Sequence, residues 1–218
     1  MTLGLLGGTF DPVHCGHLDV ARAAHEALGL GAIWFIPARL PPHRTSPHAS
    51  AAHRFAMAAL AILDEPNGWR VSDLEMESPL PSYTAATLDR LEAQGIDLRQ
   101  VCFITGADAF RDIGIWKDYP FILDRCHFAA VSRPGAPASG LGDALPALKP
   151  RMIGAAGTMS GPPRIHLIDA PTAPVSSTAI RQAIIDGRPL SGLVPDRVAA
   201  HIARHGLYAR PSATQGVA

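Results

Sequence analysis

The sequence predicts an α/β domain in which an open parallel β-sheet is covered by helices on both faces. Short apolar runs of strand length alternate along the chain with longer segments whose apolar residues recur at helical spacing. Such alternation favours parallel strands joined by right-handed crossovers. The chain has 218 residues, 47% of them hydrophobic, so one core can bury roughly 70% of the unfolded surface. We therefore expect a single Rossmann-like domain over residues 1–210.

The N-terminal segment is predicted to form a strand, a glycine turn and a helix. Leu3–Leu6 is an apolar run, and apolar side chains recur at helical spacing over Leu18–Leu28. Between them lies Gly7–His17, with the sequence GGTFDPVHCGH. Because Gly7 and Gly8 lack a Cβ, the backbone can turn sharply there and a ligand can approach its N–H groups.

Four further elements are expected before residue 100. The apolar run Ala32–Pro37, which ends in proline, predicts the second strand, and Trp69–Met76 the third. Helical patterns over Ala51–Leu63 and Tyr83–Ala93 predict a helix before and after that third strand.

Three strands are expected in the second half of the chain, at Val101–Thr105, His127–Ser132 and Arg164–Ile168. The last two are separated by Pro134–Pro163, which is rich in proline, glycine and alanine. A connection of that length is either an excursion or a lid. We expect a variable surface loop, in which Leu141–Leu148 can form one short helix.

Two helices are expected near the C-terminus. Ser177–Asp186 has a capping residue at its start and is followed by a glycine stop, and Pro195–His205 ends at Gly206. The last residues, Pro211–Ala218, are small and polar, and we expect them to be disordered.

Composition limits the classes of function. The formal net charge is zero, so no overall field favours nucleic acid or an acidic membrane. Cys15, Cys102 and Cys126 are widely spaced and form no CxxC pair, which predicts reduced thiols and a cytoplasmic protein. We expect neither a signal peptide nor a membrane span. The sequence carries no signal for an oligomeric state.

The glycine-rich segment has the chemistry of a polyphosphate site. His14 and His17 lie nearly one helical turn apart, so both imidazoles can lean toward the unpaired N–H groups and the positive dipole end of the helix. A simple turn explains two glycines equally well. Two histidines at this spacing can also bind zinc, although no third ligand follows in a recognisable metal spacing. We expect no metal site built by the protein.

The segment GGTFDPVHCGH resembles the GGTFDPxHxGH signature of the HxGH nucleotidyltransferases, and in detail that of the bacterial nicotinate-nucleotide adenylyltransferases. A second signature of that family, ISSTxIR, matches VSSTAIR at Val175–Arg181. Two motifs in the right order are far more specific than either alone. The resemblance extends from Leu3 to about Tyr208.

The resemblance implies an ATP site. It makes His14, His17 and Arg181 the catalytic residues, which stabilise charge on the phosphates. It assigns Gly106 and Asp108, in the sequence ITGAD, to adenosine; as an alternative, Asp108 is an ordinary helix cap. PPHR at residues 41–44 matches a phosphate-reaching element, and a solvated loop explains it equally well. The implied ATP-binding residues are Gly7, Gly8, Thr9, Phe10, His43, Arg44, Gly106, Asp108, Ser177 and Thr178.

The resemblance also implies a site for nicotinate mononucleotide. PSYT at residues 81–84 and the Trp116–Lys117 pair match elements that bind the pyridine ring in the family. Trp116 is expected to stack on the ring, and Thr84 and the Lys117 N–H to hold its carboxylate. A packed core aromatic is the alternative for Trp116. The implied residues are Tyr83, Thr84, Trp116, Lys117 and Arg133.

The implied reaction is in-line attack of nicotinate mononucleotide on the α-phosphorus of ATP, without a covalent enzyme intermediate. Mg²⁺ is expected to arrive with the ATP phosphates. Two alternatives remain open: a related transferase acting on phosphopantetheine or using CTP, and a nucleotide-binding sensor without catalysis. The first has no reason to carry PSYT together with Trp116. The second is expected to have lost a histidine or Arg181.

Overall fold

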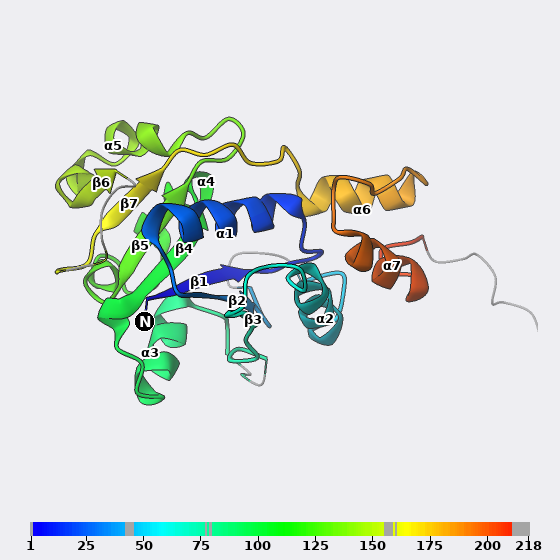
Figure 1. Ribbon diagram of the computed structural model, residues 1–218, viewed down its shortest axis with the longest axis horizontal. Helices are drawn as coiled ribbons and strands as arrows, with labels where there is room; N and C mark the ends of the chain where they lie inside the picture. Colours follow the sequence, from blue (N-terminus) through cyan, green and yellow to red (C-terminus); the bar gives the residue numbers. More distant parts are fainter. Residues whose placement is uncertain are drawn as a thin grey trace, which may run out of the picture.

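The structure is a computed structural model that describes residues 2–41, 46–76, 78, 80–154, 159 and 161–210. Seven parallel strands form one sheet in the order β3-β2-β1-β4-β5-β7-β6 (Figure 1). The predicted α/β fold with an open parallel sheet is therefore confirmed. The strands are β1 (Leu3–Gly8), β2 (Ala32–Pro37), β3 (Trp69–Val71), β4 (Val101–Gly106), β5 (His127–Val131), β6 (Met152–Gly154) and β7 (Ile165–Ile168).

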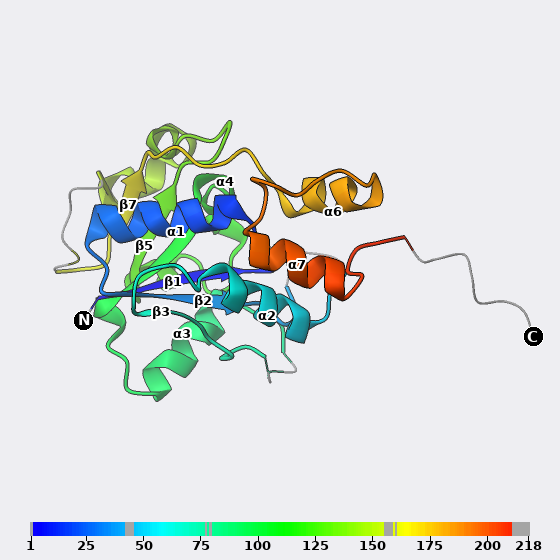
Figure 2. The same cartoon turned by 45° about the vertical axis from the view of Figure 1, so that its right-hand side comes forward.

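Helices cover both faces of the sheet. The helix α1 (Cys15–Leu28) lies over one face and α3 (Thr84–Ala93) over the other, and α2 (Ala51–Ala61) packs beside α7 (Asp196–Arg204) (Figures 1 and 2). The remaining α-helices are α4 (Ala107–Phe110), α5 (Leu141–Ala144) and α6 (Ser177–Ile185). Five 3₁₀ segments are η1 (Leu98–Gln100), η2 (Ile113–Ile115), η3 (Phe121–Asp124), η4 (Ala138–Gly140) and η5 (Pro146–Arg151).

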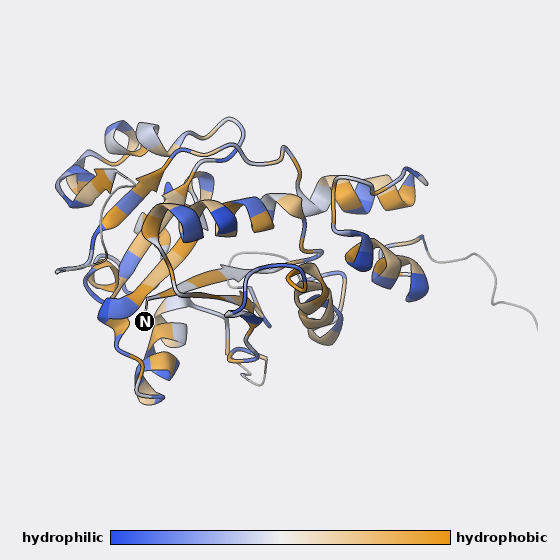
Figure 3. Ribbon diagram, in the orientation of Figure 1, coloured by the Kyte–Doolittle hydropathy of each residue, from blue (hydrophilic) through white to orange (hydrophobic). Residues whose placement is uncertain are grey.

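Each strand supplies side chains to two cores because successive residues point to opposite faces. In β1, Leu5 packs with Leu88 of α3, while its neighbour Leu6 packs with Leu18 of α1 in the other core. Both faces are largely buried, so the central strands are mainly apolar, as their hydropathy shows (Figure 3). This explains why the sequence carries continuous apolar runs rather than alternating patterns.

The third strand is shorter than predicted. The expected strand Trp69–Met76 is reduced to β3, and the chain then turns. Ser72 Oγ accepts a hydrogen bond from the Leu74 N–H at 3.3 Å, and the Met76 N–H donates to the Asp73 carbonyl at 2.7 Å. The Ser72 side chain and the turn at Asp73 therefore take up backbone N–H groups that a longer strand would need.

The segment expected to be a surface loop, Pro134–Pro163, contains regular structure. Its strand β6 was not predicted: it has three residues, pairs only with β7 at the sheet edge, and is too short to show a period. The short helix expected over Leu141–Leu148 is divided into α5 and η5, because proline begins the second segment.

The strand order reverses between β1 and β4, which are neighbours at the centre of the sheet. In open α/β sheets such a reversal leaves a crevice at the carboxyl ends of the strands. No helix within the described ranges is long and apolar enough to cross a lipid bilayer. The tail Pro211–Ala218 lies outside the described residues.

Candidate active site

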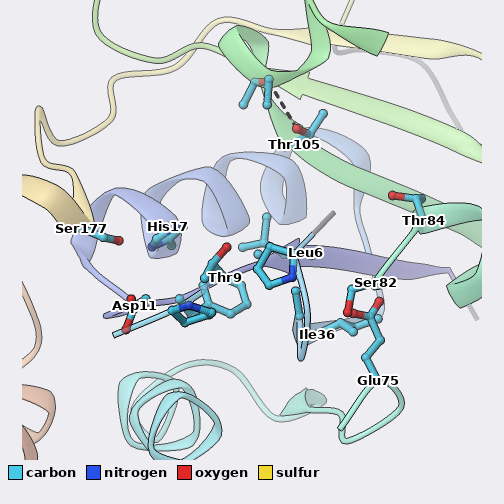
Figure 4. A pocket seen from close by; sticks show the side chains of 18 of the residues that line it. Leu6, Thr9, Asp11, His17, Ile36, Glu75, Ser82, Thr84, Thr105 and Ser177 are labelled. Atoms are coloured by element: carbon cyan, nitrogen blue, oxygen red, sulfur yellow. Dashed lines mark hydrogen bonds between the residues drawn. The ribbon is translucent and has the colours of Figure 1, made fainter. Parts of the chain in front are cut away.

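A pocket of about 490 Å³ opens at the carboxyl edge of β1 and β4. It is lined by all the predicted site residues that the structure describes, from both signatures and from the predicted acceptor site (Figure 4). His43 and Arg44 lie outside the described residues. The residues brought together are Gly7, Gly8, Thr9, Phe10, His14, His17, Tyr83, Thr84, Gly106, Asp108, Trp116, Lys117, Arg133, Ser177, Thr178 and Arg181.

The two glycines do not form the expected sharp turn. Gly7 and Gly8 are the last residues of β1, and the chain turns after them, with Phe10 at φ +50°. A Cβ on Gly8 would lie 2.8 Å from the Phe10 ring, and one on Gly7 would lie 3.0 Å from the ring of Phe103. The glycines are needed because two buried aromatic rings pack directly against the strand.

The two histidines stack at the start of α1. The centroids of the His14 and His17 rings lie 3.7 Å apart with 28° between the ring planes. The backbone N–H of His14 donates to His17 Nδ1 at 3.2 Å. A neutral imidazole has one protonated nitrogen, so this bond leaves the proton of His17 on Nε2. His17 therefore presents Nε2–H as a donor.

Burial and the positive charge of Arg133 lower the pKa of His14 to about 3. His14 is 2% exposed, and its Nδ1 atom has no hydrogen-bond partner among the described residues. His14 is therefore neutral at pH 7, and as a neutral ring it offers one N–H donor.

The second signature places three polar side chains beside the first. Arg181 Nη1 donates to the Asp11 carbonyl at 2.6 Å, and its Nη2 donates to Thr178 Oγ1 at 3.2 Å. The Ser177 hydroxyl donates to the Pro12 carbonyl at 2.8 Å. These bonds join the start of α6 to the loop after β1, and they fix the guanidinium at the pocket wall.

The ITGAD element, which the resemblance assigns to adenosine, leads into α4. Gly106 is the N-cap of this helix and Asp108 its second residue, so Asp108 is not the cap. A Cβ on Gly106 would lie 3.0 Å from Arg133 Cγ, and it would meet the Asp108 carboxylate. Close packing of this kind requires glycine.

Arg133 lines the same pocket as the predicted acceptor residues, and its guanidinium lies against the first signature. Its guanidinium donates to the Gly16 carbonyl at 3.0 Å and to the Val175 carbonyl at 3.2 Å. It therefore connects β5 to the start of α1 and to the second signature.

The predicted acceptor residues lie at another wall of the same pocket. Thr84 is the first residue of α3, where helical N–H groups have no intrahelical acceptor. Lys117 Nζ lies 5.2 Å from the centroid of the Tyr83 ring. Trp116 is half-buried, packs edge-on against Phe103 at 5.8 Å between centroids, and still lines the pocket. The Trp116 ring therefore both packs against the core and lines the pocket.

Asp11 is a pocket residue that sequence reasoning missed, although it lies within the first signature. Its carboxylate is buried and accepts the His48 N–H at 2.8 Å, the Ala49 N–H at 3.0 Å and the Tyr208 hydroxyl at 2.9 Å. Burial raises the pKa of Asp11, but these hydrogen bonds and the charge of Arg181 outweigh it and lower the pKa overall. Only the fold brings these donors together.

A buried arginine, Arg54, was also missed. It is 1% exposed and donates to the carbonyls of Ala38 at 2.6 Å, Thr9 at 2.7 Å, and Arg39 and Ala49 at 3.3 Å. The signal was present in the sequence, because Arg54 occupies the apolar stripe of its helix. It fixes the backbone of the first signature.

The pocket offers donors for anionic oxygens rather than a cage for a cation. Within the described ranges, no three His, Cys, Asp or Glu side chains are grouped to hold a metal ion. The three cysteines are free thiols, and Cys102 and Cys126 are buried.

Comparison with known proteins gives the family. The profile of the cytidylyltransferase-like family matches residues 5–183. A probable nicotinate-nucleotide adenylyltransferase from Roseiflexus sp. strain RS-1 is 41% identical over 209 residues, covering 94% of this chain and 97% of that protein. Another from Stenotrophomonas maltophilia strain K279a is 38% identical over 215 residues, covering 94% and 96%.

A solved structure shows the same fold. Nicotinic acid mononucleotide adenylyltransferase from Plasmodium falciparum, complexed with NaAD, superposes with a TM-score of 0.73 at 18% identity, covering 95% of this chain and 97% of that one. The chain belongs to the cytidylyltransferase-like family and, within it, to the nicotinate-nucleotide adenylyltransferases.

Proposed function

We propose that the protein transfers the adenylyl group of ATP to nicotinate mononucleotide, which gives nicotinate adenine dinucleotide and pyrophosphate, a step of NAD biosynthesis. The observation that carries this proposal is the continuity of one pocket, which joins the histidine signature to the wall formed by Thr84 and Trp116. Two nucleotides bound at these places would meet in the same cavity. The names of the relatives at 41% and 38% identity support the same substrates.

At the ATP end, the pocket supplies fixed donors to phosphate oxygens. His17 offers Nε2–H, the neutral ring of His14 offers one N–H, and Arg181 carries a permanent positive charge. Donors held in place before the reaction stabilise the charge that develops at the α-phosphorus. The negative charge of bound ATP would favour protonation of His14, against the effect of burial.

Direct attack by the mononucleotide phosphate fits the residues better than a covalent intermediate. Cys15 is half-buried, does not line the pocket, and burial raises the pKa of its thiol. The Ser177 hydroxyl already donates a hydrogen bond to the Pro12 carbonyl. Catalysis then consists of positioning and charge stabilisation.

At the acceptor end, α3 and the Trp116 segment would hold the pyridine. The N–H at Thr84 and the positive end of the helix dipole suit the ring carboxylate. The ring of Trp116 offers an aromatic face, and Lys117 adds a positive charge nearby. An uncharged carboxamide would gain less from this wall, so nicotinate is preferred over nicotinamide.

Mg²⁺ would be held by the phosphates of ATP. The Asp11 carboxylate at this end of the pocket already accepts three hydrogen bonds, and no cluster of metal ligands is found among the described residues, so the residues fit a metal bound to substrate. When bound, the ion would neutralise charge on the departing pyrophosphate. The free cysteines support a cytoplasmic location.

A pyrophosphate-release assay tests the proposal. ATP is offered with nicotinate mononucleotide, nicotinamide mononucleotide or phosphopantetheine, and CTP replaces ATP in a parallel series. Rapid release only with ATP and nicotinate mononucleotide is expected. Faster release with phosphopantetheine or with CTP would identify a different transferase, and no release with any pair would refute catalysis.

A further inference from the structure

A buried carboxyl group lies at the acceptor end of the pocket and has no role in the mechanism above. Glu75 follows β3, is 6% exposed, and lines the pocket beside Tyr83, Thr84 and Thr87. Its side chain points toward the Ser82 hydroxyl, well away from His17 (Figure 4). The group therefore borders the place proposed for the pyridine ring.

No basic side chain in the described part of the chain forms an ion pair with Glu75. The nearby cations are engaged elsewhere: Arg90 Nη2 donates to Ser78 Oγ at 2.7 Å, Arg39 Nη1 donates to the Met76 carbonyl at 3.1 Å, and Lys117 Nζ lies over the ring of Tyr83. A buried carboxylate without a cation is costly, and a proton removes that cost.

The hydrogen bonds around Glu75 accommodate that proton. Thr87 Oγ1 lies within hydrogen-bond distance of two acceptor oxygens, Glu75 Oε1 and, at 3.2 Å, the Tyr83 carbonyl, and it is placed to donate to either of them. A hydroxyl has one proton to donate. If Thr87 donates to the carbonyl, its oxygen must accept from Glu75, which is then a carboxylic acid.

Burial raises the pKa of Glu75, and this effect outweighs the charge of Arg90 and the hydrogen bonds that Ser82 and Thr87 could donate to an ionised carboxylate. A raised pKa favours the protonated form, in which Glu75 is the donor to Thr87. An anion bound at Thr84 would raise the pKa further, because like charges disfavour ionisation.

We propose that Glu75 is a specificity-determining positioning residue that acts as a neutral carboxylic acid. Its proton is donated to Thr87, whose hydroxyl donates to the Tyr83 carbonyl and holds the first turn of α3 in place. A neutral group here leaves the wall free of negative charge, so it admits the ring carboxylate of nicotinate mononucleotide. This role rests on the proposed function, whereas the protonation of Glu75 does not.

Infrared spectroscopy tests the protonation without substrate. The difference spectrum between the wild type and Glu75→Gln at pH 7 is expected to contain the C=O band of a protonated carboxylic acid. Raising the pH of the wild type removes the band, and Thr87→Val shifts its frequency. Absence of the band at pH 7 overturns the proposal, even if the protein is an active adenylyltransferase.

Kinetics test the effect on specificity. Glutamine is neutral and keeps a donor for Thr87, so Glu75→Gln is expected to keep KM for nicotinate mononucleotide within about twofold at pH 7. If only the protonated enzyme binds the anion, KM of the wild type rises about tenfold per pH unit above the pKa of Glu75, while KM of the variant lacks this rise. KM for ATP is unchanged in both.

Glu92→Gln is the matched control, because it removes a carboxylate from α3 that is exposed and paired with Arg125. Its KM values are expected to follow the wild type at every pH. A tenfold rise of KM in Glu75→Gln at pH 7, or equal pH profiles of Glu75→Gln and the wild type, overturns the role of Glu75. If no enzyme form uses nicotinate mononucleotide, the proposed function fails, and the infrared band still reports the proton.

Discussion

The substitution Tyr208→Phe tests whether the C-terminal end of the described chain stabilises the first signature. The Tyr208 hydroxyl donates to Asp11 Oδ1 at 2.9 Å, and the ring packs against the core that contains α1. Phenylalanine removes the hydroxyl and keeps the ring. The change therefore isolates one hydrogen bond to a buried carboxylate.

A hydrogen bond to a charged group contributes about 1.5–3 kcal/mol to stability. Asp11 keeps the His48 and Ala49 N–H donors, so its carboxylate is not left without partners. We expect the free energy of unfolding at pH 7 to fall by about 2 kcal/mol, near the lower end of this range.

The effect of Tyr208→Phe should depend on pH. The pKa of Asp11 in the folded protein lies below its ordinary value of 3.8, so the stabilisation is fully present above pH 3.8. It is lost as the pH falls through the folded pKa, because the protonated carboxyl is a weaker acceptor. The difference between variant and wild type should shrink in that acidic window.

Urea unfolding followed by circular dichroism measures these values. Tyr119→Phe is the matched control, since no hydrogen bond of its hydroxyl is found within the described ranges, and it should change stability by less than about 0.5 kcal/mol. A double-mutant cycle with Asp11→Asn should give a coupling energy of about 1 kcal/mol or more. Coupling indistinguishable from zero would refute the proposed link between Tyr208 and Asp11.

Three further predictions concern the pocket and the sheet. His17→Ala should lower the rate of pyrophosphate release by about 10² to 10³ with the fold intact by circular dichroism; near-normal turnover would remove His17 from the catalytic residues. Gly106→Ala should raise KM for ATP by about tenfold, because the new Cβ would lie 3.0 Å from Arg133 Cγ, whereas Gly114→Ala, with nothing within 4 Å, should have no effect; equal KM values would contradict this packing argument. Burial, with the neighbouring imidazole on β5, lowers the pKa of His166 to about 4, so the folded state holds it neutral. Because the unfolded state takes up the proton first, the free energy of unfolding falls by up to about 3 kcal/mol as the pH falls from 6.5 toward 4. The variant His166→Gln should show a smaller fall when urea unfolding is measured across this pH range.

Periodicity and signatures in the sequence predicted most of the fold. Apolar residues identified the six strands β1 to β5 and β7, because local composition reflects burial: all but β3 are buried on at least part of both faces, and β3 buries Trp69 on one face. The edge strand β6 was missed because three residues, two half-buried and one exposed, give no pattern. The end of β3 was placed too late, since Ser72 and Asp73 form a turn whose hydrogen bonds compete with the strand.

The signatures identified where a site would lie, but not how its residues are held. Asp11 accepts hydrogen bonds from residues 37 and 197 positions away along the chain, and Arg54 donates to four carbonyls from three separate segments. Neither set of partners follows from spacing. The role of the glycines also differed from the expectation, because the rings of Phe10 and Phe103 that exclude a Cβ come from the packing of β1 against its surroundings.

The sequence by itself determined the alternation of strands and helices, the two signatures and the classes of donor that they carry. These depend on local properties: burial periodicity, glycine and proline geometry, and side-chain chemistry. Tertiary structure alone decided that the acceptor wall and the histidine signature share one pocket, that Arg133 lies against α1, and that Glu75 is buried with no ion pair to any described residue. These features depend on which distant segments pack together, and the free energy of that packing is a property of the whole fold.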